Sequence, residues 1–237
     1  MIAEPNPRLE SARSKFSVVA SAGVALAGAA VVIGWWLDIA LLRSVFPSLA
    51  TMKANTALAF LLSGASLWLL QPQQPSQWRR RIAQACVGTV FLVGMLTLAQ
   101  DLFGWRLHVD ELLFRDATGS VKAPHPCRMA PDTALNFILI GCVLVVLDIE
   151  IRRGRRPAQL LALPPMIVAS LGLIGYGYSV ASFYRLASYT GMALHTALVF
   201  LVLSSGVLSA RPRSGVMAIV TSGNRGGQIV LRGVPDL

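Results

Sequence analysis

The amino-acid sequence predicts an all-α integral membrane protein, and two properties of the chain lead to that fold class. Only 14% of the 237 residues are charged and 54% are hydrophobic, with a mean hydropathy of +0.61, whereas average soluble proteins carry about 25% charged residues. The apolar residues also occur in long blocks without charge instead of alternating with polar residues. These observations exclude a disordered chain, a collagen, a coiled coil and an ordinary soluble domain.

Six charge-free runs approach the length of about 20 residues that a helix needs to cross about 30 Å of hydrocarbon. They cover residues 17–37, 54–70, 82–100, 133–147, 158–184 and 186–210. The first run ends at Trp35 and Trp36 without a small-residue cleavage site, so we expect a true first span and not a signal peptide. The fourth run is a full span only if it begins near Met129, and Pro164 and Pro165 predict a kink in the fifth. The sequence therefore predicts six transmembrane helices.

Lysine and arginine residues are unevenly distributed between the two sides of this predicted membrane domain. The side that holds residues 1–16, 79–81, 152–156 and 211–237 carries twice as many of them as the other side, which also holds six of the eleven acidic residues. Because basic loops stay on the cytoplasmic side, we expect both termini there, in the inner membrane of a bacterium. Residues 1–16 and 211–237 are then cytoplasmic tails of a membrane domain at 17–210. The isoelectric point near 10.6 is explained by anionic lipid headgroups beside these loops, so we expect no nucleic-acid partner.

A nine-residue motif occurs three times, and each copy opens a predicted span. The copies begin at Met52, Met129 and Met192 and follow the pattern M-x-x-[N/D/H]-T-A-L-x-F, and each charge-free run ends 18 residues after its Met. A repeat of this kind predicts duplicated structural units, here three helical hairpins whose second helix opens with the motif. Hairpins repeated in the same orientation are expected to pack with pseudo-symmetry about an axis along the membrane normal.

One interpretation of the motif is structural. Asn55, Asp132 and the three motif threonines are candidate N-caps, whose side-chain oxygens would accept hydrogen bonds from free backbone N–H groups of the first turn. A Phe and a small residue also recur one turn apart on one helix face, which suits close contact between helices. These pairs are Phe60 with Gly64, Phe137 with Gly141, and Phe200 with Ser204.

A second interpretation of the motif is ligand binding, and the sequence leaves both open. Three helix N-termini, each with a positive dipole end, would converge near the outer surface and form a shallow pocket for an anionic or polar ligand. The residues that would line this pocket are Asn55, Thr56, Asp132, Thr133, His195 and Thr196.

No arrangement of residues predicts an enzyme, a resident cofactor or a metal ion. The chain contains no Gly-x-Ser-x-Gly nucleophile elbow, and Cys86 and Cys142 fall inside predicted spans, where Cys is usually a small apolar filler. A metal site on the outer side is the alternative, but its spacing matches no standard zinc pattern. That alternative would use His108, His125, Cys127 and His195.

Three segments of the chain carry a resemblance to a known family. They are the M-x-x-[N/D]-T-A-L-x-F helices, the VDELLF stretch at 109–114 ahead of RMAPDT at 128–133, and the GVMAIVTS stretch at 215–222. Over residues 16–231 the chain resembles the N-terminal multi-pass membrane region of bacterial sensor histidine kinases and diguanylate cyclases that contain PAS domains. In that family the region is a membrane input module, so the resemblance implies signal perception in the inner membrane and transfer to a cytoplasmic output domain.

The resemblance leaves two hypotheses for function. The sequence ends at Leu237, where members of that family continue into output domains, so we expect this chain to act through a separate protein. The first hypothesis is a non-enzymatic, sensor-type membrane module. The second is an accessory or structural subunit, recruited from the same family, of a larger respiratory, photosynthetic or transport complex. Both hypotheses expect membrane lipids and another integral membrane protein or complex as partners.

Overall fold

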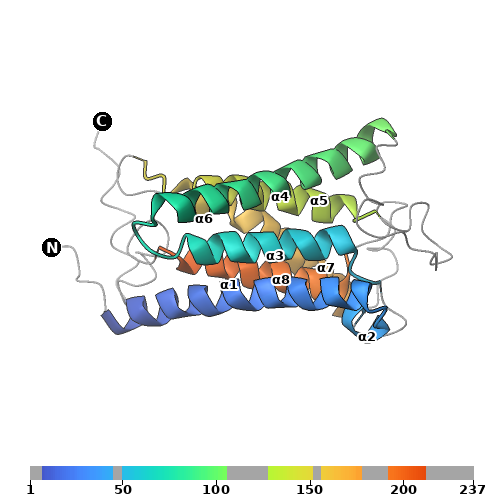
Figure 1. The fold of residues 1–237 in the computed structure, drawn as a ribbon, viewed down its shortest axis with the longest axis horizontal. Coiled ribbons are helices and arrows are strands. Elements are labelled where there is room, and N and C mark those ends of the chain that lie inside the picture. The colour runs from blue at the N-terminus through green and yellow to red at the C-terminus, as the bar shows by residue number, and fades with distance from the viewer. Residues whose placement is uncertain (1–6, 45–49, 106–127, 152–155, 178–191, 212–237) are drawn as a thin grey trace, which may run out of the picture.

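The computed structural model describes residues 7–44, 50–105, 128–151, 156–177 and 192–211, and within them 80% of the chain is helical and no strand is present. The long helices run along one common direction, so the bundle has two ends (Figure 1). We name the end that holds Met52, Met129 and Met192 the methionine end, and the opposite end, which holds Arg211, the arginine end. The helices are α1 (Pro7–Trp36), α2 (Ala40–Arg43), α3 (Ala54–Leu69), α4 (Gln77–Phe103), α5 (Pro131–Val145), α6 (Pro157–Leu161), α7 (Leu163–Gly177) and α8 (Leu194–Ser209).

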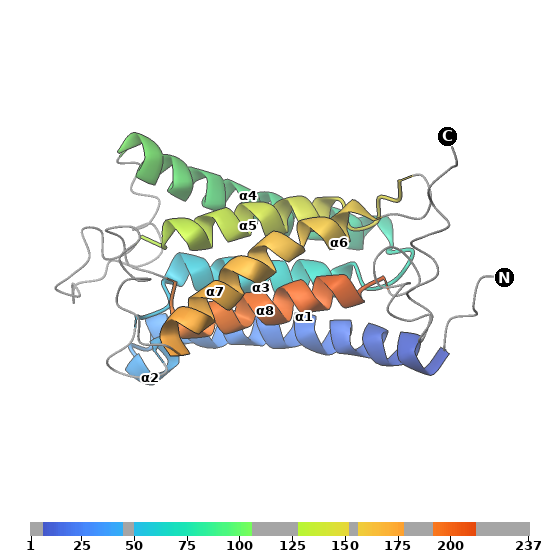
Figure 2. The same ribbon diagram turned by 180° about the vertical axis from the view of Figure 1, so that it is seen from behind.

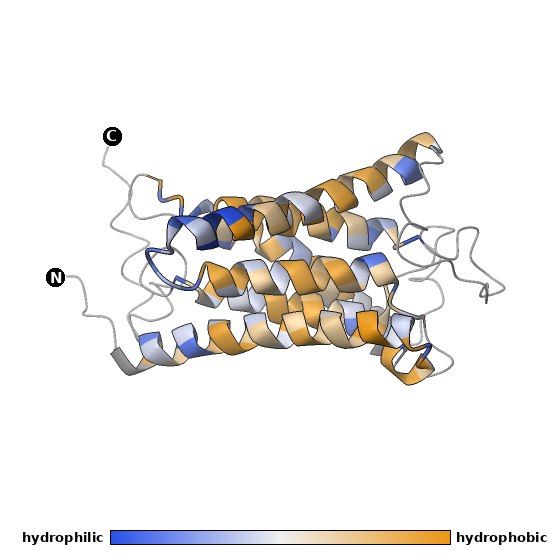
Figure 3. Cartoon of the chain, in the orientation of Figure 1, coloured by the Kyte–Doolittle hydropathy of each residue, from blue (hydrophilic) through white to orange (hydrophobic). Residues whose placement is uncertain are grey.

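Long and short apolar helices alternate along the described chain. Three helical segments are long and apolar enough to cross a membrane, namely Leu9–Trp36 in α1, Gln77–Phe103 in α4, and Pro157–Tyr176 in the combined α6 and α7. Helices α3, α5 and α8 are also apolar but have only 15 or 16 residues. Apolar residues cover the middle of the bundle and polar residues gather at its two ends (Figure 3). The predicted all-helical architecture is therefore confirmed, and three of its described helices are long and apolar enough to cross a membrane.

The three short helices lie at the centre of the bundle and the long helices surround them (Figures 1 and 2). Helix α1 packs against α3 and α8, α4 packs against α3 and α5, and α7 packs against α5 and α8. Each long helix therefore lies between two short ones. The three hairpins close into a ring, because the first helix of the first hairpin contacts the last helix of the third.

The fifth apolar run is interrupted as its prolines predict. Helix α6 ends at Leu161, and α7 begins at Leu163, directly before Pro164 and Pro165. Proline has no N–H for the helix ladder, and its ring displaces the preceding turn, so the predicted kink is confirmed. Helix α7 then runs obliquely across its neighbours (Figure 2). The ends of this predicted span and the start of the next, at 178–184 and 186–191, lie outside the described residues.

Two glycines bring α1 and α3 into contact through their backbones. A Cβ atom added at Gly28 would lie 2.5 Å from the carbonyl oxygen of Ala57 and 2.5 Å from the nitrogen of Leu61. A Cβ atom added at Gly64 would lie 2.6 Å from the nitrogen of Ala25. Real Cβ atoms do not approach backbone so closely, so only glycine permits this helix spacing.

Candidate functional site

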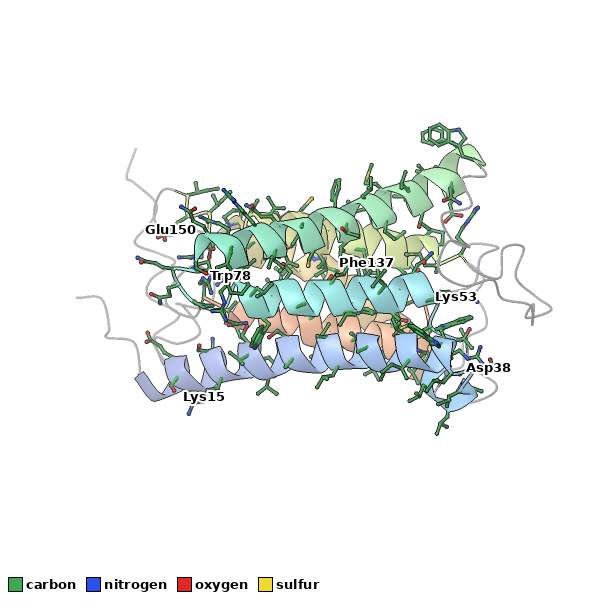
Figure 4. The ribbon with its side chains drawn as sticks, viewed as in Figure 1. Lys15, Asp38, Lys53, Trp78, Phe137 and Glu150 are labelled. Atoms are coloured by element: carbon green, nitrogen blue, oxygen red, sulfur yellow. The ribbon has the colours of Figure 1, made fainter. Side chains whose placement is uncertain are left out.

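The three motif phenylalanines meet at the centre of the bundle. The ring centroids of Phe60, Phe137 and Phe200 lie 4.6 to 4.9 Å apart, and the rings are inclined to one another by 54° to 63°. Edge-on and tilted arrangements at this separation are favourable for aromatic rings. Each Phe is the seventh residue of its helix, so the triangle lies about 9 Å below the helix starts. Figure 4 labels Phe137 in the interior of the bundle.

The phenylalanines belong to a stack of four layers along the bundle axis. Each layer has one residue from each of α3, α5 and α8, and none of the twelve residues is more than 2% exposed. Repeats at i, i+4, i+7 and i+11 lie on one helix face, so the motif builds a closed threefold core. From the methionine end the layers are Thr56, Thr133 and Thr196; Phe60, Phe137 and Phe200; Ser63, Ile140 and Leu203; and Leu67, Leu144 and Val207.

The residues predicted to line a pocket lie at the methionine end, where the three motif threonines form the first layer of this core. Asn55, Asp132 and His195 occupy the second position of α3, α5 and α8, and the motif threonines occupy the third. Asn55 and the threonines are buried, whereas Asp132 and His195 are half-buried. The three helix starts therefore lie above the phenylalanine triangle, and whether they form the predicted pocket stays a prediction.

The prediction that these residues are N-caps was wrong. The three helices begin two or three residues earlier than such caps would require, so Asn55, Asp132 and the threonines lie in the first helical turn. The capping residues have extended backbone and make no side-chain capping hydrogen bond. They are Lys53, Ala130 and Ala193.

Proline explains the early start of α5. Pro131 is the first residue of that helix, where its fixed φ suits the helix and its missing N–H costs nothing. The carboxylate of Asp132 accepts a hydrogen bond from the backbone N–H of Thr133 at 2.7 Å and lies within electrostatic reach of the Met192 backbone N–H. The carboxyl group at the start of α5 therefore interacts with the third repeat as well as with its own helix.

Asn136 is a buried polar residue that sequence reasoning missed. It is 0% exposed, and neither its side-chain oxygen nor its side-chain nitrogen has a hydrogen-bond partner among the described residues. Ala134 and Ile138 of α5 face Gly94 of α4. Asn136 therefore lies about 180° around the helix from the face that packs on α4. The signal was present in the repeat, because Asn136 aligns with Ala59 and Val199.

Other buried polar atoms in the interior of the bundle also have no hydrogen-bond partner within the described ranges. The Oγ atoms of Ser63 and Ser204, Oγ1 of Thr97 and Nε2 of His195 belong to this group. They come from α3, α4 and α8, all of which pack on α5. The interior of the bundle therefore combines apolar packing with several polar groups that have no hydrogen-bond partner among the described residues.

The methionine end is held together by hydrogen bonds to the residues that begin each repeat. Nε1 of Trp35 in α1 donates to the carbonyl of Met52 at 3.0 Å, and the hydroxyl of Tyr176 in α7 donates to the carbonyl of Met192 at 3.0 Å. In the second hairpin a largely buried ion pair joins Arg128 to Asp101 at 2.9 Å. Each long helix is thus tied to the start of its short partner.

The arginine end is closed by Arg211, which is only 7% exposed. Its Nε and Nη2 atoms donate to Oδ1 of Asp148 at 3.1 and 2.7 Å. Nη2 also donates to the carbonyl of Leu70 at 2.7 Å, and Nη1 donates to the carbonyls of Gln71 and Ala210 at 3.2 and 3.1 Å. The C-terminal carbonyls of helices lack intrahelical donors and carry partial negative charge, and the guanidinium supplies both a positive charge and donors. We name this group, formed by Arg211, Asp148 and the carbonyls of Leu70, Gln71 and Ala210, the arginine staple.

The staple extends the threefold repeat by one position. Gln71, Asp148 and Arg211 each follow the motif Met of their repeat by 19 residues. Sequence reasoning assigned Arg211 to a cytoplasmic tail, whereas the structure places its side chain inside the base of the bundle. Opposite charges at equivalent positions of two repeats were the signal that would have revealed the contact.

No group of three or more His, Cys, Asp or Glu side chains that would hold a metal ion occurs in the part of the chain that the structure describes. His108, His125 and Cys127 lie outside those residues, and Cys86 and Cys142 are free thiols. The groups with binding capacity are the amide of Asn136, which both donates and accepts hydrogen bonds, and the polar first turns above it.

Comparison of the chain with known protein families, with curated proteins and with solved structures found no match. The function is therefore inferred from the bundle itself and from the motifs of the sequence.

Proposed function

We propose that this chain is a sensor-type input module that crosses the bacterial inner membrane six times, with both termini in the cytoplasm. It catalyses no reaction and passes its state to a separate partner protein. One observation carries the proposal: the short helices connect the buried amide of Asn136, which has no hydrogen-bond partner among the described residues, to the arginine staple at the point where α8 ends. The resemblance of the motif helices to the membrane regions of sensor kinases supports the same function.

The position of the short helices supports six crossings. A helix of 16 residues is about 24 Å long, which is less than the hydrocarbon thickness of about 30 Å. Helices α3, α5 and α8 are enclosed by the long helices, and the extended residues that precede them include Met52, Met129 and Met192, which are all buried. Non-helical backbone is tolerated at membrane depth when protein surrounds it. The short helices therefore complete their crossings with extended segments inside the bundle.

The buried amide supports a site for a polar ligand or signal. An unsatisfied amide in an apolar interior costs several kcal/mol, and polar residues inside membrane proteins commonly mark functional positions. In the other two repeats the same position holds Ala59 and Val199, so the helix packing does not require an amide there. The buried amide of Asn136 lowers stability and has no hydrogen-bond partner among the described residues. A role in binding would explain why the chain keeps an asparagine at this position.

The path from Asn136 to the staple supports signal transfer. Helix α5 carries Asn136 and ends at Val145, three residues before Asp148, which binds Arg211. Closely packed helices move as rigid elements and switch between discrete arrangements instead of deforming continuously. A shift of α5 at Asn136 would therefore move Asp148. It would weaken or strengthen the hydrogen bonds between Asp148 and Arg211, which fix the end of α8.

Hydrogen–deuterium exchange on the full chain in lipid nanodiscs tests the coupling. The variant Asn136→Val copies the residue of the third repeat, and the control Leu135→Val changes the neighbouring, exposed residue. We expect the first variant to change the exchange of the last turn of α8 and of Arg211 at least threefold, and the control to leave them unchanged. A change confined to α5 would contradict signal transfer through the helices.

Purification in mild detergent followed by mass spectrometry tests the second hypothesis. A sensor module would come alone or with a substoichiometric signalling protein. Stoichiometric recovery with a large respiratory, photosynthetic or transport complex would instead identify an accessory subunit and overturn the sensor proposal.

A further inference from the structure

The start of α4 carries an unusual concentration of positive charge. Trp78 is followed by Arg79, Arg80 and Arg81, and the first turn of the helix holds no acidic residue. A helix N-terminus is itself positive, so acidic residues are favourable there and arginines are not. The first turn of α4 therefore provides no acidic side chain that would offset the charge of these arginines.

The three arginines point to different surroundings. Arg80 lies 3.9 Å from Oδ2 of Asp148 and so belongs to the edge of the arginine staple. The guanidinium of Arg79 lies over the indole ring of Trp68 in α3, 5.7 Å from its centroid. Arg81 is exposed. No carboxylate among the described residues lies within ion-pair distance of Arg79 or Arg81, so two guanidinium groups are available to an anion.

Apolar surface lies directly beside these two charges. Trp68 is 47% exposed and Trp78 is 61% exposed, and Ile82, one turn further along α4, is also exposed. Figure 4 shows Trp78 at the same end of the bundle as Lys15 and Glu150, and Figure 3 shows the strongly polar start of α4 meeting the apolar middle of the helix. The surface therefore changes from cationic to apolar within about one helical turn, and indole rings are typical of that boundary in membrane proteins.

We propose that Arg79 and Arg81 bind the headgroup phosphate of an anionic phospholipid at the α3–α4 surface. The two arginines are two residues apart and so do not face each other; they lie on the two flanks of the α4 face that carries Trp78 and Ile82. Trp68 holds the guanidinium of Arg79 and does not contact the phosphate. The planar guanidinium of Arg79 is held on the indole face, and its N–H edge remains free for two parallel hydrogen bonds to phosphate oxygens. The acyl chains lie along the exposed apolar face that begins at Trp78 and Ile82. A free phosphate would use only the charges, whereas a lipid uses the charges and the adjoining apolar surface. This site requires only that the bundle is embedded in a membrane, so it stands apart from the sensing role.

The test uses the full chain in a neutral detergent, with short-chain phosphatidylglycerol as the probe and native mass spectrometry and thermal stability as the readouts. Each of Arg79→Ala and Arg81→Ala is expected to weaken phosphatidylglycerol binding about fivefold, the factor that one basic residue contributes at an anionic membrane surface. The control Lys15→Ala removes an exposed charge from α1 at the same end, and we expect it to change the affinity less than twofold. Each variant is first shown to have the circular dichroism spectrum of the wild type without lipid.

Arg79→Lys separates a built site from general attraction between charges. Lysine keeps the charge but loses the planar stacking and the paired hydrogen bonds, so we expect at least a threefold loss of affinity. An unchanged affinity for this variant, or a loss for Lys15→Ala as large as for Arg79→Ala, would overturn the proposal. Equal binding of phosphatidylcholine would also overturn the proposal, because the site would then not select an anionic headgroup. Full competition by glycerol phosphate would overturn it as well, because the site would then not distinguish a lipid from a free phosphate.

Discussion

Replacing Arg211 by Ala is expected to lower the free energy of unfolding by about 3 kcal/mol. Removing one member of a buried ion pair costs about 3–5 kcal/mol, because the remaining charge stays buried without a partner. The lower end of this range applies here, since Asp148 is 23% exposed and Arg80 remains 3.9 Å from it. The carbonyls of Leu70 and Gln71 also lose their donors, but they lie at a helix end. At 1.4 kcal/mol per factor of ten, the unfolding equilibrium would shift by about 100-fold.

Reversible unfolding in mixed micelles, followed by circular dichroism, measures this change. Arg43→Ala is the control, because Arg43 pairs with Asp38, whose side chain is 88% exposed, so its removal leaves no charge buried. This variant also loses the stacking of Arg43 over Trp35, and the exposed pair and the stacking contribute about 1 kcal/mol or less each. Arg211→Lys should recover less than half of the loss, because the guanidinium makes its contacts through Nε, Nη1 and Nη2, whereas lysine has a single nitrogen to replace all three. A loss for Arg211→Ala no larger than that for Arg43→Ala would refute the idea that the guanidinium holds the base of the bundle together.

Two further predictions use the same unfolding measurement. Phe137→Ala should cost about 3–5 kcal/mol, the range for a large buried aromatic residue, whereas Phe103→Ala, at an exposed position in α4, should cost less than about 1 kcal/mol; equal losses would show that the triangle is not the core. Gly28→Ala should destabilise the protein by about 1–3 kcal/mol, because its Cβ would meet the backbone of α3. Gly23→Ala in the same helix has open space around the added atom and should be neutral or slightly stabilising, so a similar loss in both glycine variants would contradict the close backbone contact.

The repeat made the core of the bundle predictable from the sequence. A motif that opens three apolar runs in register predicts equivalent positions, and Phe60, Phe137 and Phe200 do occupy equivalent positions around one axis. The kink before α7 was also predictable, because a proline pair affects the backbone locally. In both cases the physical cause lies within a few residues of its effect.

The helix starts and the staple could not be predicted as easily, because each depends on contacts between distant segments. Whether Asp132 caps α5 or lies in its first turn is decided by Pro131 and by the packing of the third repeat against it. The pairing of Arg211 with Asp148 joins residues 63 positions apart, and nothing local distinguishes this arginine from the other basic residues near the helix ends. Asn136 was overlooked because the motif treats its position as variable, although that variation is itself informative.

The positions at which the three repeats differ carry more functional information than the positions at which they agree. Residues shared by all three copies, such as the motif threonines and phenylalanines, build the symmetric core and are explained by packing. In the aligned repeats, Asn136 occupies the interior position that holds Ala59 in the first repeat and Val199 in the third. Arg211 occupies the position at the base that holds Gln71 in the first repeat and Asp148 in the second. A symmetric bundle would be stable without an unsatisfied amide and would close its base without an ion pair. Because Asn136 lies on α5 and the ion pair joins the segments that follow α5 and α8, any transfer of a signal through the bundle is expected to follow these two helices.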